Sequence, residues 1–337
     1  MAALMGGEVL ALAKTAVIAL VVGVLHSPVV NAEPSAEGGW LTPLRRQLVA
    51  RASQEYGLQP APVADARRLV VSVHGYNSNA ESGARLLKRA ERSGLACAHF
   101  AYPNDQPLAE SAHLLAGELR RLQVQRPERK VSLVAHSMGG LVARAVVEDP
   151  RLCAGTVDQL IMVGPPTHGS ELARVAVGTD LWEHWLDRSS GSPWRRTRDS
   201  ITDGLGEAAR DLTPGSKFLV ELNKRPRNAR VRYTLILGSK AAVTDQQMEW
   251  LRRRLCGALS SIGARDSAGR LDNCLRQFDE VVDGKGDGVV AIGRARLEGV
   301  DDVVTLPFGH LEIVEDDATG PALDAQNVIV ERLKTSS

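Results

Sequence analysis

The chain has 337 residues, a length that fits about two average domains or one α/β domain with insertions. Hydrophobic residues make up 44% and charged residues 24% of the sequence, which excludes an intrinsically disordered chain. The 41 Lys and Arg residues are balanced by 40 Asp and Glu residues, so no bulk positive field exists to bind a nucleic acid by counterion release.

Residues 1–32 have the pattern of a secretory signal peptide. The run Thr15–Leu25 carries no charge, Lys14 precedes it, and residues 30–32 offer the small side chains that a signal peptidase requires. An uncleaved membrane anchor is the alternative, because residues 9–30 are long enough to span a bilayer. Under both interpretations we expect the rest of the chain to lie outside the cytoplasm. After cleavage it would be secreted or periplasmic, and with an uncleaved anchor it would lie on the extracytoplasmic side of the membrane.

Residues 33–66 form a polar segment with an amphipathic stretch, and residues 67–337 alternate short apolar runs with helical patterns. Each run has at most one polar residue and does not alternate, as in strands buried on both faces of a parallel sheet. This alternation predicts an α/β class fold with a doubly wound, mostly parallel central sheet and helices on both faces. The expected strands are Leu69–Val73, Ala96–Ala101, Val131–Ala135, Leu160–Val163, Tyr233–Leu237 and Val303–Leu306, and the first helices are Ser82–Ser93, Pro107–Val124 and Leu141–Glu148.

Two insertions interrupt this alternation. Residues 167–228 are rich in Gly, Arg and Trp and lack a strand pattern, which predicts a cap over the carboxyl edge of the sheet, where such folds bind ligands. Residues 239–282 form the second insertion and contain an amphipathic segment, Gln246–Leu259. The four cysteines are not spaced like a metal site, and we expect disulfides, with Cys256 and Cys274 as a local pair. For Cys97 and Cys153, buried thiols are an equal alternative.

Ser137 occupies the apex of a strand, turn and helix pattern. The segment Val131–Ala135 runs into His-Ser-Met-Gly-Gly, and a helical run follows at once. So tight a turn exposes the serine hydroxyl and admits only small residues two positions before and after it. Ala135 and Gly139 fill these positions. The pattern A-x-S-x-G is therefore a variant of the usual G-x-S-x-G, and it predicts that Ser137 is a nucleophile.

A serine nucleophile needs a histidine base and an orienting carboxylate, which this fold supplies in the chain order Ser, Asp, His. His310 is the only histidine beyond residue 184, and it follows the last predicted strand. For the acid we expect Asp287, in the turn Gly-Asp-Gly-Val-Val, with Asp283 and Asp245 as alternatives. The same stretch superficially resembles a calcium loop, but cations stand at two of its ligand positions, so no metal site is predicted.

When a serine attacks a carbonyl group, the oxyanion that forms needs two N–H donors. One follows the nucleophile and the other lies in the loop after the first core strand, so we expect the backbone N–H groups of Met138 and Tyr76. Gly75 would let that loop approach closely, and His74 is interpreted as a hydrogen-bonded structural residue.

These segments resemble the α/β-hydrolase superfamily, specifically its lipase and esterase branch, over nearly all of residues 69–311. The stretch 164–170 (GPPTHGS) is similar to a loop of many lipases, and 211–219 (DLTPGSKFL) resembles a cap-helix motif of secreted lipases and of proteins similar to GPI inositol deacylases. The turn around Asp287 is also similar to that of lecithin–cholesterol acyltransferase relatives. Ala135 and the insertion at 239–282 depart from these patterns. The resemblance implies ester hydrolysis through an acyl-enzyme.

The sequence therefore predicts a serine carboxylic ester hydrolase that acts on an acyl ester or a lipid without a metal or organic cofactor. Acyl transfer to another alcohol uses the same acyl-enzyme and stays open, as does a non-catalytic binding protein on a hydrolase scaffold. Three of the five tryptophans lie in the predicted cap: Trp182, Trp185 and Trp194. They would contact a lipid substrate or a lipid interface, or alternatively form the cap's own core.

Overall fold

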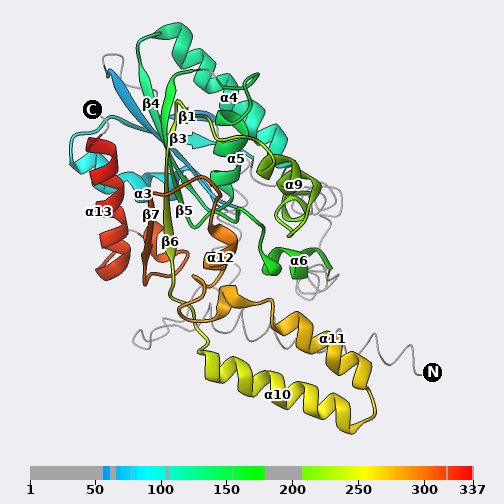
Figure 1. Cartoon of the computed structure of the whole chain (residues 1–337). Helices are drawn as coiled ribbons and strands as arrows, with labels where there is room; N and C mark the ends of the chain where they lie inside the picture. Colours follow the sequence, from blue (N-terminus) through cyan, green and yellow to red (C-terminus); the bar gives the residue numbers. More distant parts are fainter. Residues whose placement is uncertain are drawn as a thin grey trace, which may run out of the picture.

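A sheet of seven strands forms the centre of the protein (Figure 1). The computed structural model describes residues 56–60, 66–76, 78–103, 106–153, 155–178, 207–315 and 318–335. The strand order is β1-β3-β2-β4-β5-β6-β7; β1 pairs antiparallel with β3, and the other pairs are parallel. The strands are β1 (Gly57–Gln59), β2 (Arg68–Val73), β3 (Cys97–Ala101), β4 (Lys130–His136), β5 (Val157–Val163), β6 (Arg232–Gly238) and β7 (Val303–Leu306).

The sheet confirms the fold class and all six predicted strands. In β4, every residue except Lys130 is buried, because helices cover both faces of the sheet and leave no polar side for alternation. The strand β1 was not predicted. It has three residues at the antiparallel edge of the sheet, too few to show a periodic pattern.

Helices pack on both faces of the sheet, as predicted (Figure 1). On one face α3 (Ala80–Arg92) and α13 (Gly320–Lys334) contact each other and share a core with the sheet. On the other face α4 (Leu108–Gln125) and α5 (Met138–Val147) pack together in the larger core. The helices α3, α4 and α5 lie within a few residues of their predicted positions.

The first insertion contributes α6 (Glu171–Gly178) and α9 (Lys217–Asn223) to the described structure. Trp182, Trp185 and Trp194 lie outside the described residues, as do the predicted signal peptide and most of residues 33–66. In the part of the chain that the structure describes, no helix is both long and apolar enough to cross a membrane.

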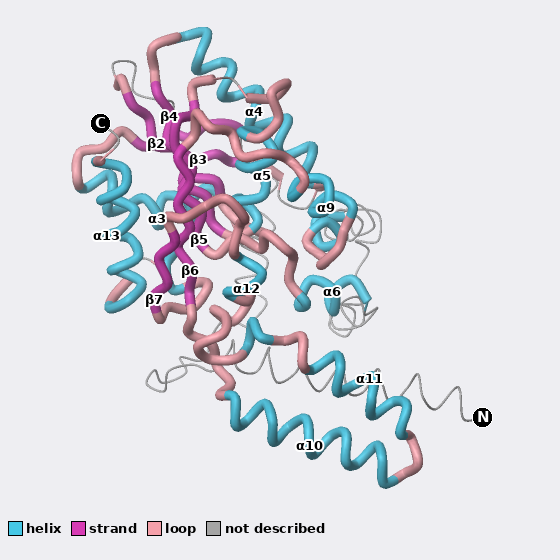
Figure 2. The backbone as a smooth tube through the Cα atoms, viewed as in Figure 1, coloured by secondary structure: helices cyan, strands magenta, loops and turns pink. Residues whose placement is uncertain are grey.

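The second insertion forms a helical hairpin. Its helices, α10 (Asp245–Ser261) and α11 (Arg265–Leu275), lie side by side beyond the ends of β6 and β7 (Figure 2). The hairpin has its own small apolar core, which includes Met248 and Leu271. The chain then returns to the sheet through η1 (Asp279–Val281), α12 (Ile292–Ala295), β7 and η2 (Glu312–Val314).

The expected disulfide between Cys256 and Cys274 is wrong. All four cysteines lie within the described residues, and none of them is bridged. Cys256 on α10 and Cys274 on α11 instead pack as partly buried side chains against the core of the hairpin. Apolar packing therefore joins the two helices where a covalent link was expected.

Candidate active site

Ser137 stands in a strained turn between β4 and α5. Its φ and ψ are 54° and −128°, and it is the one residue other than glycine with a positive φ in the described parts of the chain. A Cβ atom at Gly139 would lie 2.5 Å from the carbonyl oxygen of His74, so the helix can approach β2 only with glycine at this position. The backbone strain predicted from the small flanking residues is therefore present at the predicted serine.

His310 and Asp287 face each other in two loops at the same edge of the sheet. His310 Nδ1 lies 2.7 Å from Asp287 Oδ2, and both side chains are buried. The other carboxylate oxygen, Oδ1, accepts hydrogen bonds from the backbone N–H groups of Val289 (3.0 Å) and Val290 (2.8 Å). Because a carboxylate accepts, this contact places a proton on His310 Nδ1, and in the neutral imidazole Nε2 then has the lone pair that a general base needs.

The two alternative acids have other partners. The Asp245 carboxylate forms an ion pair with Lys285 at 2.5 Å, and the Asp283 carboxylate accepts a hydrogen bond from the Ala241 N–H at 3.2 Å. Of the three candidates, Asp287 is the one that the structure places against the imidazole.

Ser137 and His310 line one cavity of about 560 Å³. The cavity is also lined by Tyr76 and by Val289, which lies in the turn 286–290 around Asp287, called the acid turn below. A Cβ atom at Gly75 would lie 2.9 Å from Ser137 Cβ, so the loop after β2 passes directly beside the serine. Met138 is the first residue of α5, whose N-terminus faces the same turn. The predicted oxyanion donors, Tyr76 and Met138, thus flank Ser137.

His74 lies beneath this loop. Its side chain is buried, its Nδ1 lies 3.1 Å from the Gly75 carbonyl oxygen, and its ring stacks on Tyr102 with centroids 4.2 Å apart. These contacts fit the structural role expected for it.

His136 is a site residue that the sequence reasoning missed. Its Nε2 lies 2.9 Å from the His310 carbonyl oxygen, and the two rings are tilted with centroids 4.7 Å apart. Burial, followed by the nearby His310, lowers the pKa of His136 to about 3, so this imidazole is neutral. A carbonyl only accepts, and His136 therefore donates from Nε2. No local signal indicates this contact, because its partner is 174 residues away in the chain.

Gly164 was noted only as part of a loop similar to that of lipases, and the structure gives it a place in the site. It follows β5 with φ +54°, and a Cβ atom there would lie 2.9 Å from Asp287 Oδ2 and 3.2 Å from His310 Nδ1. The absence of a side chain at this position makes room for the histidine and carboxylate pair.

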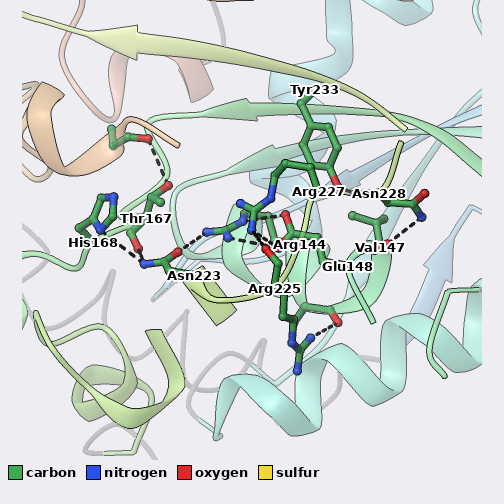
Figure 3. A network of polar contacts seen from close by, with 12 residues as sticks. Arg144, Val147, Glu148, Thr167, His168, Asn223, Arg225, Arg227, Asn228 and Tyr233 are labelled. Carbon is green, nitrogen blue, oxygen red and sulfur yellow. Dashed lines mark hydrogen bonds and ion pairs between the residues drawn. The ribbon is translucent and has the colours of Figure 1, made fainter. Parts of the chain in front are cut away.

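A buried polar network lies at the C-terminal end of α5 (Figure 3). Arg144 on α5 donates from Nε and Nη2 to the two Glu148 oxygens, at 3.1 and 3.2 Å, and from Nη1 to Asn223 Oδ1 at 2.9 Å. Asn223 on α9 donates in turn to the Thr167 carbonyl oxygen at 2.9 Å. The network therefore ties α5 to α9 and to the loop that begins at Gly164.

The sheet, the covering helices and the strained serine turn together define the α/β-hydrolase fold. The sequence profile of the family "Lipase (class 2)" matches residues 123–265, and that of a domain of unknown function (DUF7379) matches residues 45–193. The chain therefore has the α/β-hydrolase fold, and its residues 123–265 are similar to lipases of class 2.

Several solved structures are similar to this chain, and the lipase BlEst2 shares its fold. The mature form of the Bacillus licheniformis lipase BlEst2 superposes with a TM-score of 0.51 at 19% identity, over 82% of this chain and 98% of that one. Its propeptide form gives a TM-score of 0.51 at 20% identity, over 80% and 52%. A Paleococcus ferrophilus monoacylglycerol lipase gives a TM-score of 0.46 at 16% identity, over 84% and 100%. No curated protein sequence matches the chain.

Proposed function

We propose that this chain is a serine carboxylic ester hydrolase, with Ser137 as nucleophile, His310 as general base and Asp287 as the carboxylate that orients it. One observation carries the proposal. A serine in a strained turn shares a cavity with a histidine whose Nδ1 is held 2.7 Å from a buried carboxylate. This arrangement supplies the groups that acyl transfer to serine requires.

In the proposed reaction, Ser137 Oγ attacks the ester carbonyl while its proton moves to His310 Nε2. Asp287 stabilises the resulting imidazolium through Nδ1–H, and the N–H groups of Tyr76 and Met138 stabilise the oxyanion. The alcohol leaves with the proton from His310. Water, deprotonated by the same imidazole, then releases the acid from the acyl-enzyme.

Lipids or other acyl esters are the proposed substrates, supported by the match to class 2 lipases and by the fold shared with BlEst2. Three further proposals rest on the sequence. The cap contacts a lipid interface through Trp182 and Trp185, residues 1–32 direct export, and the chain is similar to GPI inositol deacylases.

The test compares the purified chain with its Ser137→Ala variant on p-nitrophenyl esters of short and long acyl chains. Loss of a triad nucleophile lowers turnover by on the order of 10⁶-fold, so the variant should show only background hydrolysis. A fluorophosphonate probe should label the wild-type protein and not the variant. Equal activity of both proteins would overturn the assignment. Ester products formed with an added alcohol would identify acyl transfer, and a folded protein inert to the probe would identify a non-catalytic scaffold.

A further inference from the structure

Glu280 is a buried carboxylate that the proposed reaction does not use. It lies in η1, between the α10–α11 hairpin and the acid turn, and is 0% exposed. Its Oε1 accepts hydrogen bonds from the backbone N–H groups of Glu171 (2.7 Å) and Leu172 (3.2 Å), the first two residues of α6. Within the described residues its Oε2 is buried without a hydrogen-bond partner. A buried, half-satisfied carboxylate is costly, and its presence calls for an explanation.

The main chain of Glu280 holds the turn that carries Asp287. The Gly288 N–H donates to the Glu280 carbonyl oxygen at 2.7 Å. A Cβ atom at Gly286 would lie 2.6 Å from the same oxygen, so the turn reaches this distance only because glycine occupies that position. Glu280 therefore packs against the residues on both sides of Asp287.

The side chain of Glu280 holds a second support for the same turn. Ser170, just before α6, donates from Oγ to the Val289 carbonyl oxygen at 2.9 Å and lies 3.4 Å from Glu280 Oε1. The Val289 N–H is itself a donor to Asp287 Oδ1. The carboxylate thus fixes the start of α6. Ser170, just before α6, holds the Val289–Val290 peptide, whose N–H donates to Asp287 Oδ1 at 2.8 Å.

The charged side chains near Glu280 form ion pairs with one another, so the first turn of α6 is the main partner of the Glu280 carboxylate. Glu171 on α6 is paired with Arg294 on α12 at 2.6 Å and with Arg174 on α6 at 3.3 Å. Arg294 also attracts Glu280, but it forms its ion pair with Glu171. The two α6 N–H groups and the Ser170 hydroxyl supply the direct hydrogen bonds to Glu280 Oε1.

We propose that Glu280 is a positioning residue: by joining the first turn of α6 to the acid turn, it sets the direction in which the Asp287 carboxylate faces His310. This inference rests on the proposed function, since it assigns Asp287 its orienting role. The carboxylate ties both insertions to the site, because η1 closes the second and α6 begins in the first.

The experiment compares Glu280→Ala, Glu280→Gln and Ser170→Ala in the full chain. Glu280→Ala removes the acceptor of the two α6 N–H groups, and a misdirected carboxylate should lower kcat by ~10- to 100-fold with KM little changed. Glu280→Gln retains an acceptor oxygen and should restore most of kcat. Ser170→Ala should lower kcat in the same direction by less. Asp158→Ala is the control, because Asp158 pairs with Arg68 at the amino ends of the strands, at the edge opposite the site; it should lower the melting temperature without changing kcat.

A second readout does not require turnover. The low-field proton resonance of the His310 Nδ1–H group, which reports its hydrogen bond to Asp287, should shift or broaden in Glu280→Ala and stay in place in the control. If Glu280→Ala folds with wild-type kcat and an unshifted resonance, the inference is wrong. If it does not fold, an unchanged kcat and resonance in Ser170→Ala overturns it equally. A wild-type protein that hydrolyses no ester would count against the proposed function alone, since the resonance still tests the positioning role.

Discussion

The His310 carbonyl oxygen accepts a hydrogen bond from Nε2 of His136, the residue immediately before Ser137, at 2.9 Å. The strand that carries the proposed nucleophile therefore also holds the backbone of the loop that carries the proposed base. Because burial keeps His136 neutral, it does so without placing a second positive charge beside the imidazolium that the proposed reaction forms on His310.

Replacing His136 should lower the rate of acylation. Phe at this position keeps the ring and removes the donor, so the loop carrying His310 loses its contact with β4, and kcat should fall by ~10- to 100-fold. Gln can donate from its amide nitrogen and should recover part of the loss. Single-turnover kinetics with a p-nitrophenyl ester measure the step directly. Wild-type rates in a folded His136→Phe protein would show that the contact has no catalytic consequence.

Gly164→Ala should reduce both activity and stability. The added Cβ would lie 2.9 Å from Asp287 Oδ2, so the carboxylate must move, and kcat should fall by ~100-fold. The positive φ should also cost about 1–2 kcal/mol of unfolding free energy. Gly94→Ala is the matched control, since Gly94 has φ +83° with open space around it. Urea denaturation should show a similar loss in both variants, whereas kcat should fall only in Gly164→Ala; equal kcat in the two would contradict the assigned role.

The strands and the serine turn were predictable because their signals are local. Runs such as Leu160–Val163 are apolar without interruption, and the small residues around Ser137 follow from one steric requirement. His310 could be chosen because chain order left no other histidine. The contacts of His136 and Glu280 could not be predicted, because each depends on a backbone group from a distant segment.

The cysteines illustrate a different limit. Cys256 and Cys274 were expected to be bridged because the chain was predicted to be exported and because they flank a polar stretch between two helix-like segments. Neither argument fixes the distance between the two thiols. The helices that carry them pack through leucines and other apolar side chains, so the hairpin forms with both thiols unbridged. The sequence predicted α10 well and indicated a second helix-like segment, but not the way in which the two are joined.

Glu280 should make stability depend on pH. Burial raises its pKa from 4.5 to about 7, so between these values the folded state binds more protons than the unfolded state. The contribution of Glu280 to the free energy of unfolding is therefore complete below about pH 4.5 and is lost as the pH rises through about 7. Over this range the free energy of unfolding should fall by up to about 3 kcal/mol. Urea denaturation at pH 5, 6, 7 and 8 should show this decline in the wild type and a smaller one in Glu280→Gln. Parallel curves for the two proteins would contradict the prediction.

Removing one partner of the Arg144–Glu148 pair should lower the free energy of unfolding far more than removing one partner of a surface ion pair. Both side chains are 0% exposed, and burial lowers the pKa of Arg144 and raises that of Glu148. Glu148→Ala would leave the Arg144 guanidinium buried without its counter-charge, which should cost about 3–5 kcal/mol. Glu118→Ala removes the partner of Arg121 on the exposed side of α4 and should cost about 0–1 kcal/mol.

Urea denaturation of the two variants checks the difference. A double variant, Arg144→Met with Glu148→Leu, distinguishes the origin of the cost: if an unpaired buried charge is responsible, removing both charges should restore part of the lost unfolding free energy. A double variant less stable than Glu148→Ala would instead show that the hydrogen bond from Arg144 to Asn223, which ties α5 to α9, is the more important contact.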